Sequence, residues 1–254
     1  MTKGLSVPAV TVEQMREVDR LMTEEYGILL IQMMENAGRN LAALVSTIAR
    51  GGPGKSALVL AGRGNNGGGG LVAARHLSNM GNPVQVVLAA RVDQLPEVQG
   101  HQASILLKMG LGLLEAEACD KERLEELLGS ADVIVDALIG YSLAGAPRGL
   151  AAVLIEKANA SGRPIVSLDV PSGLDAGSGR VYEPSIRASA TLTLALPKTA
   201  LASDEARARS GDLYLGDLSV PPGLYHRLGL EAPPLFADSR VVPLVWTGDG
   251  WVTG

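Results

Sequence analysis

The sequence predicts an α/β protein with a three-layer, doubly wound and mostly parallel sheet of the Rossmann-like type, preceded by N-terminal helices. Short, continuously apolar runs alternate along the chain with segments of helical periodicity. Such runs are typical of strands that are buried on both faces of a parallel sheet. Right-handed crossovers between these strands then place helices on both sides of the sheet. The chain has 254 residues, of which 46% are hydrophobic, and this is enough to bury such a core.

Helices come first in the chain. Thr11 and Gln14 have the spacing of a capping box, and apolar residues follow them at helical intervals. A second helix is expected over roughly 28–49, with several methionines on one face. Methionine at this spacing suits core packing or a dimer interface, so the pattern leaves both open.

Strands and helices alternate from there on. Strands are expected at 56–62, 83–89, 132–140, 164–173 and 190–198, with a late edge strand at 212–218. Helices are expected at 70–80, 97–109, 121–128 and 149–160. Gly81 is expected to cap the end of the first of these helices. Asp120 is expected to cap the start of the third, and Gly129 to lie just beyond its end.

The end of the chain has a different character. Residues 231–254 contain several prolines and then a Thr-Gly-Asp-Gly-Trp turn. We expect residues 1–230 to form one domain. We expect residues 231–254 to be an extension or a hairpin rather than a domain.

The composition excludes several classes of function. A net charge of −5 and a pI of about 5.3 argue against a nucleic-acid-binding protein, which usually carries a basic surface. Cys119 is the only cysteine, which excludes an intrachain disulfide and a thiolate zinc cluster. The histidines are far apart in sequence, which disfavours a His-rich metal site. Without a signal peptide or an apolar run of about 18 residues, the protein is expected to be soluble and cytoplasmic, with no membrane partner.

The strand ends indicate where the chemistry lies, because parallel strands share one carboxyl edge, outside which ligands bind. The segment 62–70 reads G-R-G-N-N-G-G-G-G and leads into a helix, where free N–H groups suit a phosphate. Its first glycines match the dinucleotide spacing G-x-G-x-x-G, but no acidic residue follows about 20 positions later. A tight turn without a ligand is the alternative, although glycine is costly in entropy.

Polar residues follow three other strands. Asp136 lies near one strand end, Asp169 and Ser172 near the next, and Lys198 near a third. The structural alternatives are a capping carboxylate, a self-satisfied Asp/Ser turn and a solvated lysine. Asn66, Asp136 and Ser172 offer only oxygen ligands and one formal charge, which suits a hard, weakly charged cation better than zinc.

The ordered set of motifs resembles the YjeF N-terminal-domain family over roughly residues 9–228. The motifs are QMMENA at 32–37, GNNGG at 64–68, LVAARHL at 71–77, DALIG at 136–140, DVPSG at 169–173 and LPK at 196–198. The resemblance implies an NAD(P)H-hydrate epimerase. Such enzymes interconvert the R and S forms of NADHX and NADPHX, damaged cofactors that carry water at C6 of the nicotinamide. A separate ADP- or ATP-dependent dehydratase then repairs the S form. Family members are often homodimers.

The resemblance also implies roles for individual residues. The implied substrate-binding residues are Asn65, Asn66, Gly67, Gly68, Gly69, Gly140, Tyr141, Ser142, Leu143, Ala144, Gly145, Ala146 and Asp169. Asn66, Asp136 and Ser172 match the family's K⁺ ligands. Our hypothesis is that Asp169, with Lys198, handles protons while C6 changes configuration, a contribution of about 10²–10⁴-fold. Loss and return of water, or ring opening and reclosure, would use the same residues.

One position departs from the family pattern, which usually reads G-N-N-G-G-D-G. Gly69 stands where the aspartate is expected. The change is consistent with no effect, with weaker binding, or with a member that no longer catalyses. The alternative function is therefore a non-catalytic nucleotide-binding or scaffold protein of the same fold. A third hypothesis, a nicotinamide-dependent oxidoreductase, is opposed by the missing acidic residue after the second strand.

Overall fold

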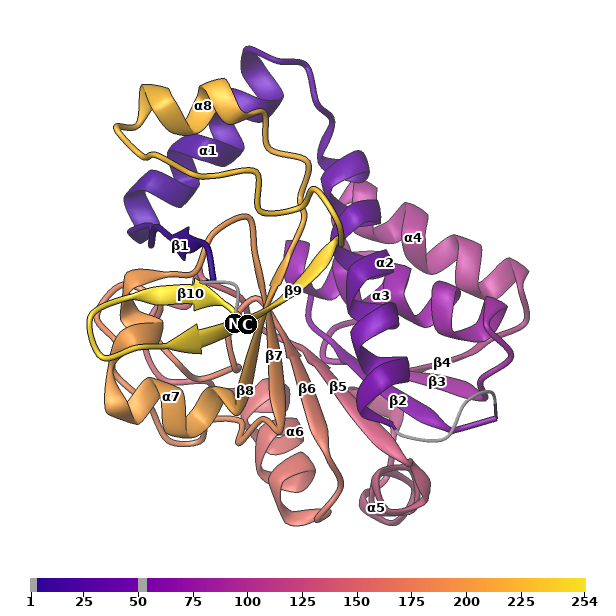
Figure 1. Ribbon diagram of the computed structural model, residues 1–254. Helices are drawn as coiled ribbons and strands as arrows, with labels where there is room; N and C mark the ends of the chain where they lie inside the picture. Colours follow the sequence, from indigo (N-terminus) through magenta and orange to yellow (C-terminus); the bar gives the residue numbers. More distant parts are fainter. Residues whose placement is uncertain (1–3, 50–53) are drawn as a thin grey trace.

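The described part of the chain forms a single ten-stranded sheet with helices on both faces. The computed structural model describes residues 4–49 and 54–254. The strand order is β1-β10-β9-β8-β7-β6-β5-β2-β3-β4, and the run from β8 to β4 is entirely parallel. Figure 1 shows the sheet twisting through the molecule with helices above and below it. The predicted fold class, an α/β protein with a mostly parallel sheet, is confirmed.

The elements have the following bounds. The strands are β1 Ser6–Val7, β2 Ala57–Ala61, β3 Val84–Leu88, β4 Gly112–Glu115, β5 Val133–Ala137, β6 Ile165–Leu168, β7 Ala190–Leu194, β8 Asp212–Gly216, β9 Val241–Trp246 and β10 Trp251–Thr253. The helices are α1 Val12–Glu24, α2 Leu30–Ile48, α3 Asn65–Asn79, α4 Glu97–Lys108, α5 Lys121–Ser130, α6 Gly149–Ala160, α7 Asp204–Ser210 and α8 Pro222–Arg227. Short 3₁₀ segments are η1 Val92–Gln94, η2 Ala116–Ala118 and η3 Thr199–Ala202.

Alternate residues of each central strand serve the two faces of the sheet. On β2, Val59 packs in the cluster that contains Leu71 of α3. Its neighbour Leu58 faces the other way, into the cluster that contains Ile155 of α6. Helices α2, α3 and α4 therefore cover one face and α5 and α6 the other, as Figure 1 shows. None of the helices in the described ranges is both long and apolar enough to cross a membrane.

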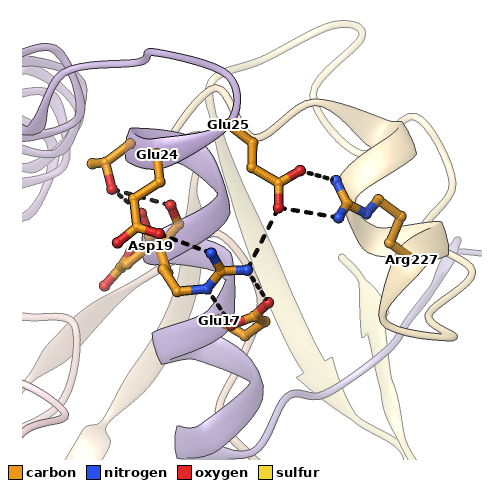
Figure 2. Close-up of polar contacts among 7 residues, drawn as sticks. Glu17, Asp19, Glu24, Glu25 and Arg227 are labelled. Carbon is orange, nitrogen blue, oxygen red and sulfur yellow. Dashed lines mark hydrogen bonds and ion pairs between the residues drawn. The ribbon is translucent and has the colours of Figure 1, made fainter.

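A separate apolar cluster joins the N-terminal helix to the end of the chain. Val18 of α1, Leu224 of α8 and Trp251 of β10 belong to it. The surface of this contact carries an ion-pair network, drawn in Figure 2. Arg227 of α8 binds Glu25, and Arg20 of α1 binds acidic neighbours including Glu25. The network is exposed, so the apolar cluster beneath it supplies most of the attachment.

The helix ends follow the predicted capping chemistry, with one exception. The capping box of Thr11 and Gln14 is present in both directions. Asp120 caps α5 by accepting a hydrogen bond from the backbone N–H of Arg123 at 2.7 Å. Gly129, expected beyond the end of α5, lies inside the helix, because α5 continues to Ser130. The prediction at Gly129 was wrong, since the residue has a helical neighbour on each side.

One prediction at the edges of the sheet was wrong, and the strands at both edges were not predicted. The strand at 212–218 was expected at an edge, but β9 pairs antiparallel with β8 and extends the sheet. The true outer strand there is β1, which pairs with β10. At the opposite edge, the short strand β4 was not predicted. The tail forms a hairpin of β9 and β10, one of the two forms expected for it.

The glycine-rich segment was expected to be a loop before a helix that begins near residue 70. The structure begins α3 at Asn65, so the glycines form its first turns. An added Cβ at Gly67 would lie 1.8 Å from the backbone oxygen of Gly62, and one at Gly70 would lie 2.6 Å from Cβ of Ala137. These glycines allow α3 to approach the strand ends more closely than any side chain permits. The close packing of α3 offsets the conformational entropy that the glycines lose on folding.

We expect Gly67→Ala to destabilise the fold by about 1–3 kcal/mol, at the upper end because a backbone atom rather than a flexible side chain blocks the new methyl group. Chemical denaturation of the variant and the parent protein measures the difference.

Gly129→Ala is the matched control, because Gly129 is also helical but has open space around its Cβ position. Alanine there should stabilise by about 0.5–1 kcal/mol through helix propensity. Equal effects at the two positions would contradict the packing argument.

Candidate functional site

A cavity of about 480 Å³ opens at the carboxyl edge of the central strands. The segments that follow β2, β5, β6 and β7 meet there, and α1 and α2 complete its walls. The lining residues are Met15, Asp19, Leu30, Met33, Met34, Ala37, Gly64, Asn65, Asn66, Gly69, Leu138, Ile139, Gly140, Tyr141, Ser142, Leu168, Asp169, Leu194, Lys198 and Leu218. The cavity thus combines an apolar wall with a small number of polar groups, as ligand sites commonly do.

A buried ion pair lies in the cavity wall. Lys198 has no exposed surface and Asp169 is 3% exposed. The Lys198 Nζ donates to Asp169 Oδ1 and to the backbone oxygen of Leu194, the latter at 3.0 Å. The solvated-lysine alternative for Lys198 is therefore wrong. A charge without solvent needs a partner of opposite charge, so each member of this pair depends on the other.

The backbone of Asp169 has the unusual conformation that places its carboxylate here. Its φ is 69°, in the left-handed region that aspartate tolerates better than most residues. Its N–H still donates to the oxygen of Leu192 at 2.7 Å, so the turn stays attached to the sheet. The turn directly after β6 therefore points the carboxylate toward Lys198 and the cavity.

Tyr141 connects two carboxylates that come from different parts of the chain. Its backbone N–H donates to Asp169 Oδ2 at 3.0 Å, and its hydroxyl donates to Asp19 Oδ2 at 2.6 Å. Burial raises the pKa of Tyr141 well above its usual range, and the charge of Asp19 adds to the effect. Tyr141 therefore stays protonated and acts as a donor to Asp19.

Asp19 was not predicted from the sequence. It lies on α1, four residues after the buried Met15, and burial raises its pKa despite the hydrogen bond from Tyr141 and the nearby charge of Lys198. The sequence did contain a signal for Asp19, because its carboxylate lies beside Met15 and Met22 on the apolar face of a predicted helix. Such a residue needs a polar partner from elsewhere in the fold, which here is Tyr141.

A second buried carboxylate cluster also involves predicted residues. Asp136 is fully buried and accepts hydrogen bonds from the Ser172 hydroxyl at 2.6 Å, the Ser172 N–H at 2.9 Å and the Ser167 hydroxyl at 2.8 Å. Burial raises its pKa, while these donors oppose the shift. In the parts of the chain that the structure describes, Asp136 forms no ion pair. The side-chain Nδ2 of Asn66 is also buried without a partner there.

The start of α3 supplies backbone donors. Gly64 is its N-cap, and the Gly68 N–H makes a bond back to the oxygen of Gly64, so the preceding N–H groups face outward from the helix start. Gln99 of α4 holds the side chain of Asn65 by donating to its Oδ1 at 2.8 Å. A helix start of this kind suits an anionic group.

The structure brings together most, but not all, of the residues expected to bind substrate. Those that line the cavity are Asn65, Asn66, Gly69, Gly140, Tyr141, Ser142 and Asp169, and the predicted catalytic residue Lys198 lines it too. Those outside its lining are Gly67, Gly68, Leu143, Ala144, Gly145 and Ala146. The first two of these face the packing contacts of α3 and the others continue along the outward loop after β5. Their roles toward a ligand stay predictions.

Gly69, the position that departs from the family pattern, lies in the cavity wall. A Cβ added there would lie 2.7 Å from Leu168 Cδ2, the end of a flexible side chain, and 3.9 Å from Ala37 Cβ. A larger residue therefore needs only a shift of Leu168. The glycine leaves this part of the cavity unfilled, whereas Gly67 makes a close contact with the backbone of Gly62.

The chain is similar to proteins of one family. Residues 30–200 match the family described as YjeF-related protein N-terminus. The chain is 48% identical over 230 residues to an NAD(P)H-hydrate epimerase of Dehalogenimonas lykanthroporepellens, covering 90% of this chain and 89% of the relative. It is 40% identical over 221 residues to the bifunctional NAD(P)H-hydrate repair enzyme Nnr of Moorella thermoacetica, of which it spans 41%. Its structure resembles the crystal structure of yeast ynu0, with a TM-score of 0.82 and 30% identity over 94% of this chain and 100% of the yeast chain.

Replacing Lys198 by methionine should destabilise the protein by about 3–5 kcal/mol, because it leaves the Asp169 carboxylate buried without a partner. Denaturant unfolding at neutral pH measures the loss. The double variant Lys198→Met/Asp169→Asn should recover part of it, since no unpaired charge remains.

Lys55→Met is the matched control. Lys55 pairs with Asp132 at 3.5 Å, but both side chains are more than a third exposed. Solvent screens this pair, so the same substitution should change stability little. A loss at Lys198 no larger than that at Lys55 would refute the structural importance of the buried pair.

Proposed function

The chain belongs to the family of YjeF-related protein N-termini, and from this membership we propose that it is an isomerase that interconverts the R and S epimers of hydrated NADH and NADPH. This activity makes it an enzyme of NAD(P)H-hydrate repair. The observation that carries the proposal is the similarity to an epimerase that is matched over nearly its full length, at 48% identity. The cavity at the strand ends supports it, because the polar motifs shared with the family converge there.

The substrate enters the cavity with its two chemical parts on different walls. The outward N–H groups at the start of α3, beside Gly64 and Asn65, suit the pyrophosphate. Apolar side chains such as Met33 and Leu168 suit the hydrated nicotinamide ring. The ring then lies near the carboxylate of Asp169. Within this proposal, the loop residues 143–146 contact the outer part of the dinucleotide.

Asp169 and Lys198 handle the proton that must move when C6 changes configuration. As the C6–O bond breaks, the N1 lone pair forms a C6=N1 double bond and the hydroxyl leaves as water after taking a proton. Water then adds to the other face and gives up a proton. Asp169 is the proton acceptor or donor, and Lys198 compensates its charge in a site without solvent. Ring opening and reclosure would need the same proton transfers.

The cation proposed from the sequence would be held by Asn66, Asp136 and Ser172, of which Asp136 and Ser172 are in direct hydrogen-bond contact. The carboxylate of Asp136 is fully buried, and its hydrogen-bond donors are neutral groups. Buried charges in proteins are usually paired or bind a metal ion. Oxygen ligands with one formal charge suit K⁺, which would supply the compensating positive charge. We therefore propose that these residues hold K⁺ next to the substrate site.

In the proposed repair pathway, epimerisation is followed by a second step, the dehydration of the S epimer. The bifunctional relatives are more than twice as long as their match to this chain. We propose that an ADP- or ATP-dependent dehydratase acts on the S epimer that this chain produces. A homodimer and a cytoplasmic location are further proposals from the sequence. The alternative function, a non-catalytic binding or scaffold member, rests on Gly69.

The purified protein should accelerate the conversion of R-NADPHX to the S form in K⁺ buffer, followed by chromatography against the slow uncatalysed exchange. Asp169→Asn should lower the rate by about 10²–10⁴-fold, because the variant cannot accept a proton. Asp93→Asn, an exposed carboxylate outside the cavity, is the control and should keep the parent rate.

No acceleration by the folded parent protein would contradict the epimerase and favour the scaffold alternative. The rate of the Gly69→Asp variant then shows whether that single position explains the missing activity. An active parent whose Asp169→Asn variant is equally fast would instead remove Asp169 from the mechanism.

K⁺ should raise the melting temperature more than Na⁺ or tetramethylammonium at equal ionic strength, because a ligand that binds only the native state stabilises it. The gain is about 2.7 kcal/mol when K⁺ is at a hundredfold excess over its Kd. Asn66→Ala should remove the K⁺-specific part while leaving the general salt effect. Identical melting temperatures in all salts would contradict the site.

A further inference from the structure

Asp19 is a carboxylate in the cavity wall to which the proposed mechanism gives no role. It comes from α1, whereas Asp169 and Lys198 come from the strand ends. Its side chain leaves α1 away from Glu17 and Glu25, as Figure 2 shows, and it does not belong to the ion-pair network on the outer surface. Its hydrogen-bond partner is the hydroxyl of Tyr141, at 2.6 Å.

Tyr141 is hydrogen-bonded to both Asp19 and Asp169. One end of the residue, its backbone N–H, binds Asp169, and the other end, its hydroxyl, binds Asp19. The two carboxyl groups therefore line the same cavity from two elements and are joined through one tyrosine. Enzymes that invert a carbon centre with water use this arrangement, in which one carboxyl group acts on the leaving oxygen and the other on the entering water.

The surroundings of the two groups differ in charge. Asp169 is bound directly by the ammonium group of Lys198. Asp19 receives a hydrogen bond from the neutral Tyr141, and burial raises its pKa, with a smaller contribution from the charge of Asp169. Two carboxyl groups with different partners in one cavity are a common basis of an acid and base pair.

We propose that Asp19 is a second catalytic residue of the epimerase, which transfers a proton to or from the C6 oxygen on the face of the ring opposite to Asp169. The inference rests on the proposed function. An epimerisation at C6 removes oxygen from one face and adds it to the other. A proton-transferring group on each wall serves both faces without turning the ring over.

The proposed reaction moves one proton from Asp19 to the substrate and one proton from water to Asp169. With the R epimer bound, Asp19 in its carboxylic acid form donates its proton to the C6 hydroxyl. The C6–O bond breaks, its electron pair leaves with the water, and the N1 lone pair forms the C6=N1 bond. Water adds to the other face of C6, the C6=N1 pair returns to N1, and the released proton passes to the Asp169 carboxylate. The opposite epimer is processed with the two roles exchanged, and proton exchange with solvent resets the pair.

The test compares kcat, KM and their pH dependence for the parent protein and Asp19→Asn with R-NADPHX. Asparagine keeps the shape and can still accept the Tyr141 hydrogen bond. We expect kcat to fall at least about 10²-fold with little change in KM, as for the loss of an acid or base. We also expect the alkaline limb of the pH profile that belongs to Asp19 to disappear. The titratable and charged groups that face Asp19 are Tyr141, Asp169 and Lys198, and Arg16 acts on Tyr141.

Tyr141→Phe is a second variant that leaves both carboxylates in place. The hydrogen bond from Tyr141 lowers the pKa of Asp19, so its removal should move that alkaline limb to higher pH. Glu17→Gln is the matched control, because it removes a carboxylate from the outer surface of the same helix and should change neither kcat nor the profile.

The outcomes distinguish a failure of the proposed epimerase activity from a failure of the proposed role of Asp19. An inactive parent protein refutes the epimerase itself. An active parent whose Asp19→Asn variant keeps its kcat and pH profile refutes only the role of Asp19. A fall in kcat with an unchanged profile also refutes it, because a merely structural residue would behave in that way. A variant that fails to fold leaves the shift in Tyr141→Phe as the deciding measurement, and no shift there overturns the proposal.

Discussion

The burial of Lys198 beside Asp169 is the constraint on which the rest of the site depends. An ammonium group without exposed surface requires that other segments close over it. The N-terminal segment does so by pairing with the chain around Lys198, since the Val10 N–H donates to the oxygen of Pro197 and the Thr199 N–H donates to the oxygen of Val10. This attachment starts α1 directly above the strand ends. The N-terminal helix therefore becomes a wall of the cavity, rather than an appendage to the sheet.

The C-terminal strands support the same wall from outside. Strand β1 pairs with β10, so both chain ends extend one sheet. Helix α8 packs on α1 through Leu224 and binds it through Arg227 at the surface (Figure 2). Elements that are far from the cavity in sequence thus hold α1 in place. The hairpin at 241–253 contributes to the site through this support, without any of its residues lining the cavity.

Local sequence patterns predicted the parallel sheet and the convergence of the strand-end motifs, because both follow from hydrophobic runs and from the shared direction of parallel strands. They did not predict what depends on long-range packing. Asp19 acquires its place only when α1 meets Tyr141, and the four-residue strand β4 forms only because β3 offers an edge. The close approach of α3 was also hidden, since a glycine run has the same appearance in a loop and at a crowded helix contact.

The glycines at the start of α3 also affect how the binding surface would respond to mutational scanning. The groups that this helix start offers to a ligand are main-chain N–H groups, which no substitution removes, and several of the positions tolerate no side chain. A scan that replaces residues by alanine would record folding defects at these positions and no loss of binding groups. The ligand contacts of this helix would therefore be almost invisible to such a scan, and backbone amide exchange in the presence of ligand would be the more direct probe.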